Sequence, residues 1–207
     1  MNRLPTSRSL VTLRVLLRVA IVAAVLLALI AVATTSRSGL IWRMSTFTYQ
    51  ANVLAAAFYL STLISPRADA RVGLRGAVVL YVVTAGVLWN LLLTGYSMGY
   101  TPANVLLHVV VPVLAITDWL LVGRGQATVR WWQPVLWLAY PAAYTALALA
   151  VLNHAGRRAP YYFLDPDSVG TTTVVTNVCV LGIGVLAVGY TLLAVNRAVA
   201  TVRIDAS

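Results

Sequence analysis

The sequence predicts an all-α integral membrane protein, a bundle of six transmembrane helices with both termini in the cytoplasm. Hydrophobic residues make up 60% of the 207 positions and charged residues only 10%, which leaves too little polar surface to cover a soluble globule. Apolar segments of about 20 residues, the length that crosses the hydrocarbon core of a bilayer, occur at 17–35, 47–65, 76–95, 102–122, 133–153 and 171–195. Because no soluble domain separates them, we expect residues 1–207 to form a single membrane domain.

The distribution of arginine predicts which side of the membrane each connection faces. All 15 lysine-plus-arginine positions are arginine, and cytoplasmic loops carry an excess of such residues. Alternate connections and the two ends of the chain hold most of them, namely Arg3, Arg8, Arg14, Arg18, Arg67, Arg71, Arg75, Arg124, Arg130, Arg197 and Arg203. The opposite connections hold fewer, namely Arg37, Arg43, Arg157 and Arg158. The pattern predicts a multi-pass protein of the plasma membrane with cytoplasmic N- and C-termini.

Charge and cysteine content narrow the classes of partner and cofactor. The net charge of +10 does not indicate a nucleic acid, because the arginines are scattered over short loops. Contact with the headgroups of membrane lipids is the better interpretation. One cysteine, Cys179, excludes an intrachain disulfide and a multi-cysteine metal site, and two histidines without glutamate do not make a zinc or iron site. We therefore expect neither a metal nor another cofactor, and the sequence specifies no oligomeric state.

The first span has a second interpretation. Its basic start and its Ala31-Val32-Ala33 pattern are also features of a secretory signal peptide. Removal of such a segment leaves five spans and does not disturb the arginine pattern, so both interpretations stay open.

Prolines predict irregular backbone in the fourth and fifth spans. Pro112 and Pro141 lack the N–H that bonds the carbonyl four residues earlier, and those carbonyls belong to His108 and Trp137. In hydrocarbon a freed carbonyl needs another partner. The fourth helix therefore either bends only for packing or admits a polar group beside the histidine.

The polar residues inside the spans gather toward the outer leaflet, where they are Thr46, Thr48, Gln50, Asn52, Asn104 and His108. Thr48 and Asn52 are four residues apart and share one helix face, as do Asn104 and His108. Polar residues in membrane helices turn toward the bundle or a wet cavity, so we expect these pairs to meet. Asp118, about 15 Å along the helix from His108, is too distant for a relay and is expected to pair with a loop arginine at the inner boundary.

This set of residues supports attack by a hydroxyl group. A threonine oxygen is a weak nucleophile that an adjacent neutral imidazole activates as a base, and an amide such as that of Asn52 can donate to a developing oxyanion. The structural alternative also stays open. Threonines at a helix start cap backbone N–H groups, and polar side chains hold membrane helices together.

Four short motifs, taken in order, resemble a known family. They are Trp42-Arg43-x-x-Thr46-Phe47-Thr48, Asn104-x-x-x-His108-x-x-x-Pro112-x-x-x-x-x-Asp118-Trp119, Tyr140-Pro141-x-x-Tyr144 and Pro160-Tyr161-Tyr162-Phe163-Leu164-Asp165. Their order and spacing resemble the androgen-induced and androgen-dependent membrane protein family and its bacterial relatives, the integral membrane regulators. The resemblance implies a multi-pass threonine hydrolase of fatty acid esters of hydroxy fatty acids. His108 matches the family's histidine. Counting from Trp42 indicates Thr46 as the nucleophile, whereas the bacterial pattern Phe-Thr-x-Gln-(Ser or Ala)-Asn indicates Thr48, which we favour.

Together these observations predict a membrane-embedded hydrolase of apolar lipid esters. Thr48 is the expected nucleophile and His108 the expected base, in a cavity of the outer leaflet that the ester enters sideways from the bilayer. The expected supporting residues are Thr46, Gln50, Asn52 and Asn104. We expect the Thr48 hydroxyl within about 4 Å of His108, directly or through one water. The competing hypothesis is a non-enzymatic lipid-binding or regulatory membrane protein in which the same residues hold a headgroup.

Overall fold

The computed structural model describes residues 7–35, 39–96, 99–122, 129–156 and 159–205. These residues form helices and turns without a strand, so the all-α class is confirmed. In chain order the helices are α1 (Ser7–Thr35), α2 (Leu40–Met44), α3 (Phe47–Ile64), α4 (Pro66–Asp69), α5 (Val72–Leu88), α6 (Pro102–Val105), α7 (Val111–Thr117), α8 (Gln133–Trp137), α9 (Ala139–Ala150), α10 (Pro166–Val169) and α11 (Thr171–Asp205). Single π-helical turns continue them at Trp89–Leu93, Leu106–Val110 and Asp118–Val122, and short 3-10 turns form at Leu152–His154 and Tyr162–Leu164.

Several helices are compatible with a multi-pass membrane protein. Within the described residues, five are long and apolar enough to cross a membrane, namely Ser9–Thr35, Val72–Leu93, Pro102–Leu121, Gln133–His154 and Thr171–Ala198. The predicted second span, 47–65, does form a helix, the 18-residue α3, but it is not one of the five. Its first turns carry Thr48, Gln50 and Asn52, and these polar residues lower its mean hydropathy. Helix length and composition alone therefore support five spans and leave the sixth open.

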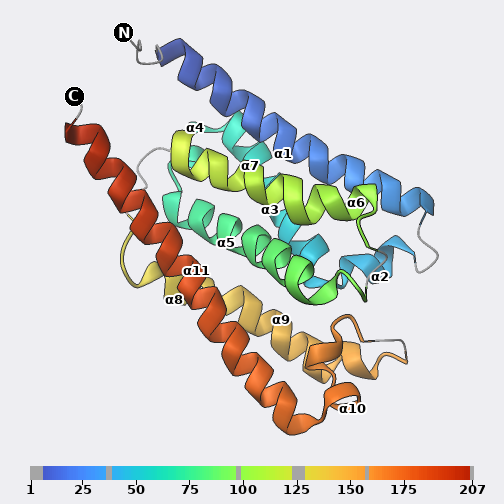
Figure 1. Cartoon of the computed structure of the whole chain (residues 1–207). Coiled ribbons are helices and arrows are strands. Elements are labelled where there is room, and N and C mark those ends of the chain that lie inside the picture. Colours follow the sequence, from blue (N-terminus) through green and yellow to red (C-terminus); the bar gives the residue numbers. More distant parts are fainter. Residues whose placement is uncertain (1–6, 36–38, 97–98, 123–128, 157–158, 206–207) are drawn as a thin grey trace.

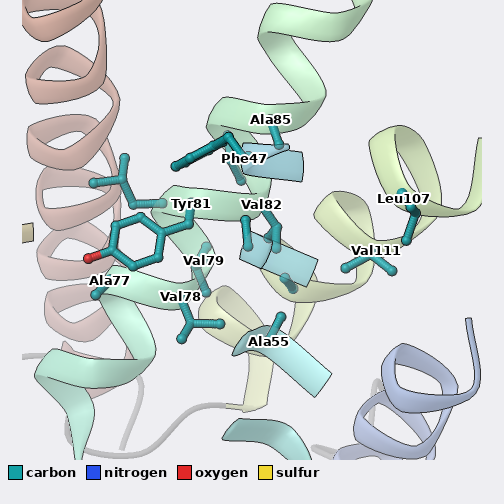
Figure 2. Packing of buried hydrophobic residues seen from close by; sticks show 14 of the residues in the cluster. Phe47, Ala55, Ala77, Val78, Val79, Tyr81, Val82, Ala85, Leu107 and Val111 are labelled. Atoms are coloured by element: carbon teal, nitrogen blue, oxygen red, sulfur yellow. The ribbon is translucent and has the colours of Figure 1, made fainter. Parts of the chain in front are cut away.

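The central helices are α3 and α5. Helix α1 packs on α3 and on the continuous helix that contains α6 and α7, while α11 packs on α5 and α8 (Figure 1). Valine-rich α5 faces the core, where its side chains cluster with Phe47 and Ala55 of α3 and with Leu107 and Val111 (Figure 2). Both chain ends lie at the same end of the bundle (Figure 1). Helix α2 and the starts of α3 and α6 lie at the other end.

Buried arginine and aspartate side chains form an ion network near the start of α1 and the end of α11. Asp118 pairs with Arg18 of α1, with Nε to Oδ1 at 3.1 Å, and with Arg75 of α5, with Nε to Oδ2 at 3.7 Å. Asp69 accepts from Arg18 at 2.7 Å and from Arg14 at 3.4 Å, and also pairs with Arg75. Burial raises the pKa of Asp69, but the hydrogen bond and charge of Arg18, together with Arg75 and Arg14, outweigh burial and hold that pKa below its ordinary value.

This network confirms that Asp118 pairs with arginine and corrects where the arginines lie. The arginine pattern assigns Arg18 to the N-terminal end of the chain and Arg75 to a connection, yet their exposed fractions are 1% and 0%. Both belong to helices that converge on Asp118, so a buried carboxylate draws them inward. Among the arginines used to predict orientation, Arg3, Arg37, Arg124, Arg157 and Arg158 lie outside the described residues.

Both internal prolines coincide with backbone irregularity, as predicted. The carbonyl of His108, four residues before Pro112, lies in the π-helical turn Leu106–Val110 and accepts from the Asn90 amide at 3.4 Å. The fifth predicted span divides into α8 and α9 around Leu138, one residue after Trp137. The polar partner that hydrocarbon requires for a freed carbonyl therefore comes, at His108, from the neighbouring helix.

Candidate functional site

The hydroxyl of Thr48 and the imidazole of His108 lie in direct contact. The Thr48 Oγ1 to His108 Nε2 distance is 3.3 Å, within the separation expected from the sequence. Thr48 is the second residue of α3, which Thr46 precedes as N-cap. Both side chains are buried, with exposed fractions of 6% for Thr48 and 5% for His108. Burying a hydroxyl and an imidazole costs free energy unless each has a hydrogen-bond partner, and here each side chain provides a partner for the other.

A backbone carbonyl sets the tautomer of the imidazole. His108 Nδ1 lies 3.0 Å from the carbonyl oxygen of Asn104, and a carbonyl can only accept a hydrogen bond. Nδ1 therefore carries the hydrogen, which leaves the lone pair of Nε2 facing the Thr48 hydroxyl. The indole of Trp89 stacks on the ring, with centroids 4.6 Å apart and planes 20° apart. Histidine is thus held from three sides in the orientation that a base needs.

Asn52 joins the two helices that carry these side chains. Its amide nitrogen donates to the Thr48 carbonyl at 2.8 Å and to the Leu107 carbonyl at 3.4 Å, and the residue is completely buried. In this arrangement the Asn52 amide nitrogen bonds two backbone carbonyls, and its expected role as a donor to a reacting oxygen stays a prediction. Asn52 fixes the spacing between α3 and the π-helical turn of His108.

The remaining predicted residues separate into two groups. Thr46 and Asn104 line the same cavity as Thr48 and His108. Thr46 donates to the Arg43 carbonyl at 2.9 Å, and the Asn104 amide donates to the Gly99 carbonyl at 2.7 Å. Gln50 instead accepts from the Tyr140 hydroxyl at 3.0 Å, on the side of α9. The structure thus brings Thr48, and not Thr46, to the imidazole, and places Gln50 outside the site.

Two cavities meet at Thr48. The larger, of about 390 Å³, opens between α2, the start of α3 and the loop before α10, and is lined by Trp42, Arg43, Thr46, Thr48, Tyr49, Trp89, Leu93, Tyr96, Asn104, His108, Ala159, Pro160, Tyr161 and Tyr162. The smaller, of about 60 Å³, lies between α5, α9 and α11. Its walls are mainly apolar, with Leu88, Phe163 and Val185 among them. Thr48, Leu93 and Tyr161 line both, so Thr48 lies between the two cavities, of which the larger has the more polar walls.

Sequence reasoning missed two aromatic residues of the site, Trp89 and Tyr161. Trp89 stacks on the imidazole, and the Tyr161 hydroxyl accepts from the Thr48 backbone N–H at 3.4 Å. Tyr161 belongs to the Pro160–Asp165 motif, which is the signal that could have found it. Trp89 has no comparable signal, because an aromatic residue inside an apolar span resembles any core residue.

The donor set of the described residues does not favour a metal, since no three histidine, cysteine, aspartate or glutamate side chains in that part of the chain gather closely enough to hold one. Comparisons with protein-family models, with curated proteins and with solved structures find no match. The family resemblance therefore rests on the four short motifs, and the geometry around Thr48 and His108 is the ground on which function is argued.

Proposed function

We propose that this chain is a membrane-embedded hydrolase of lipid esters with Thr48 as nucleophile and His108 as base. The observation that supports this most is the chain of contacts from Thr48 Oγ1 to His108 Nε2 at 3.3 Å and from His108 Nδ1 to the Asn104 carbonyl at 3.0 Å. This is the order of groups that nucleophile, base and orienting acceptor require in acyl transfer. Here a backbone carbonyl takes the place of the usual carboxylate.

In the proposed reaction His108 transfers one proton from Thr48 to the leaving alcohol and a second proton from water back to Thr48. Nε2 of His108 takes the Thr48 proton as Oγ1 bonds the ester carbonyl carbon, and the carbonyl electron pair moves to oxygen. The tetrahedral intermediate collapses, the alcohol leaves with the proton from Nε2, and an acyl-threonine remains. A water then loses a proton to Nε2 and attacks the acyl carbon. Thr48 leaves with that proton, and a carboxylic acid is released.

The two cavities support an ester that is largely apolar. A short hydrocarbon segment suits the small apolar cavity between α5, α9 and α11, whereas the larger cavity with Arg43 and Asn104 suits the polar part of a lipid. Thr48 lines both cavities, so an ester carbonyl placed at Thr48 divides the substrate between them. Membrane lipids are the proposed source of such a substrate, which reaches the site laterally from the bilayer.

The hydrolase proposal is tested with a long-chain p-nitrophenyl ester and purified protein in detergent micelles. Thr48→Ala is expected to abolish hydrolysis, and His108→Ala to lower kcat by about 10² to 10⁴, the usual contribution of a positioned base. Thr46→Ala is the matched control in the same helix start and keeps most activity. If the wild-type protein binds the ester without cleaving it, the lipid-binding hypothesis replaces this one.

We also propose that α3 is a sixth span. With six spans both termini lie on the same side of the membrane, and the distribution of arginine indicates that this side is the cytoplasm. Polar residues at the start of α3 face a cavity instead of lipid, and this supports insertion despite its lower hydropathy. In a Cys179→Ser background, Ser168→Cys is expected to react with a membrane-impermeant maleimide in intact cells. Ala70→Cys is expected to react only after permeabilisation, and labelling in the reverse order contradicts the orientation.

A further inference from the structure

The proposed acyl transfer requires a group that stabilises the oxyanion. When Thr48 attacks, a negative charge develops on the ester oxygen, and hydrogen-bond donors aimed at that position supply a large share of catalysis. The two side-chain amides of the site already bond backbone carbonyls: Asn52 donates to the Thr48 and Leu107 carbonyls, and Asn104 donates one hydrogen to the Gly99 carbonyl. Donors that lie directly beside Thr48 are better placed.

Tyr161 places a hydroxyl beside the nucleophile. It lies in the loop between α9 and α10, is 8% exposed, and lines both cavities. Its hydroxyl accepts from the Thr48 backbone N–H at 3.4 Å and hydrogen-bonds the Thr48 side chain as well. The ring packs edge-on against Tyr144 at a centroid distance of 5.9 Å and tilted against Phe163 at 5.5 Å. The hydroxyl is thus held at the place where the two cavities and Thr48 meet.

The Thr48 backbone N–H supplies a second donor. Thr48 is the second residue of an 18-residue helix, and N–H groups in the first turn have no acceptor within the helix. Its contact with the Tyr161 oxygen is long, at 3.4 Å, so a stronger acceptor can take over this N–H. The positive end of the helix dipole also favours negative charge at this position.

We propose that the Tyr161 hydroxyl and the Thr48 backbone N–H together bind the oxyanion of the tetrahedral intermediate, which makes Tyr161 a catalytic residue. This rests on the proposed hydrolase function. Burial raises the pKa of Tyr161 above its ordinary value, against the lowering effect of its hydrogen bonds to Thr48. The phenol therefore keeps its proton and donates it in a hydrogen bond to the ester oxygen as that oxygen gains charge.

The test compares Tyr161→Phe with Tyr140→Phe, since each change removes one hydroxyl from the same cluster of aromatic rings. Tyr161→Phe is expected to lower kcat for a long-chain p-nitrophenyl ester by about 10²- to 10³-fold, as removal of an oxyanion donor does, with little change in KM. The Tyr140 hydroxyl donates to Gln50 at 3.0 Å, outside the site, and Tyr140 lines neither of the two cavities. Tyr140→Phe is therefore expected to stay within a few fold of wild type.

A second readout separates charge stabilisation from a structural role. An alkyl trifluoromethyl ketone forms an oxyanion with Thr48, whereas the matching alkyl ether has no carbonyl. Tyr161→Phe is expected to weaken inhibition by the ketone about as much as it lowers kcat and to leave binding of the ether unchanged. Unchanged ketone inhibition or unchanged kcat in Tyr161→Phe overturns the assignment while the wild type remains a hydrolase. A wild-type protein without hydrolysis overturns the proposed function itself.

Discussion

The imidazole of His108 is held so that Nε2, and not Nδ1, faces the Thr48 hydroxyl. The Asn104 carbonyl takes the Nδ1 hydrogen at 3.0 Å, and Trp89 covers one ring face. The contact from Nε2 to Thr48 at 3.3 Å then follows from the rotamer of a single residue. The site therefore depends on backbone carbonyls as well as on side chains. The Asn104 carbonyl bonds the imidazole, and the Leu107 carbonyl, in the π-helical turn Leu106–Val110, bonds Asn52.

Asn52 bonds both the Thr48 carbonyl and the Leu107 carbonyl, and so we expect it to control the distance between Thr48 and His108. Asn52→Leu keeps the size of the residue but leaves the Leu107 carbonyl without its 3.4 Å partner, and a lost hydrogen bond between membrane helices costs about 1 kcal/mol. We expect a lower midpoint of thermal unfolding in detergent and a larger loss of hydrolysis than that change in stability explains.

Thr62→Val is the matched control for Asn52→Leu. Thr62 is also buried in α3, but it bonds the Tyr59 carbonyl of its own helix at 2.7 Å, far from the cavity. It is expected to leave hydrolysis near the wild-type rate. Equal activity of the two variants contradicts a positioning role for Asn52.

The sequence predicted the meeting of Thr48 and His108 because two polar pairs lay at matching depth on separate helices. It did not predict that the Asn104 contact uses the backbone carbonyl, since the spacing of four residues says only that the two share a face. Tyr161 could not be located either, because its position depends on how a loop between helices folds over the cavity.

At the scale of helices, the close approach of α5 to the His108 turn holds the histidine in place. Asn90 of the Trp89–Leu93 turn donates to the His108 carbonyl at 3.4 Å, and Gly86 of α5 lies against the same carbonyl. A Cβ at Gly86 comes within 2.7 Å of the His108 oxygen and 3.0 Å of Pro112 Cγ. Only glycine therefore permits this spacing.

Gly86→Ala is expected to push the histidine turn away from α5. Overpacking of this kind costs about 1–3 kcal/mol, and the displacement also separates Nε2 from the Thr48 hydroxyl. We expect a lower unfolding temperature and a marked loss of hydrolysis, measured on the same detergent-purified sample.

Gly184→Ala in α11 controls for the change of residue type, because nothing lies within 4 Å of its added Cβ. That variant is expected to keep wild-type activity and stability. Gly86→Ala with wild-type activity contradicts a role for the close contact in holding the histidine.

The positions of the helices along the chain were easier to predict from the sequence than the burial and contacts of single residues on them. The predicted spans 76–95 and 102–122 match Val72–Leu93 and Pro102–Leu121 to within a few residues, because long apolar runs determine them. The arginine pattern assigns Arg75 to a connection, whereas it lies on the buried face of α5. A charged residue at the end of an apolar run usually indicates the end of a membrane span. Only the fold shows that Asp118 and Asp69 compensate the charge of Arg75.

At the scale of the whole molecule, charge is concentrated at the end that carries the chain termini, and the candidate site lies at the opposite end. Arg18, Arg75 and Asp118 are almost completely buried and join α1, α5 and the helix of His108. Helix α1 also contributes Ile21, Val25 and Ala28 to the core. The network thus fixes the framework on which the site is built.

Asp118→Asn is expected to destabilise the entire bundle. Arg18 and Arg75 then share Asp69 as their remaining carboxylate partner. One buried positive charge is left without compensation, which costs about 3–5 kcal/mol. A large drop in unfolding temperature, followed by tryptophan fluorescence in detergent, is the expected result. Asp167→Asn alters an exposed carboxylate and is expected to change little, so equal effects of the two substitutions contradict the role given to the network.

The most direct measurement of the central claim is the site and rate of covalent labelling by an alkyl fluorophosphonate, mapped by mass spectrometry of peptides from the purified full chain. The account predicts one adduct on Thr48 that forms in wild type and in Thr46→Ala, slows by about 10²-fold or more in His108→Ala, and is absent from Thr48→Ala. An adduct on another residue, or labelling of Thr48 in His108→Ala at the wild-type rate, contradicts it.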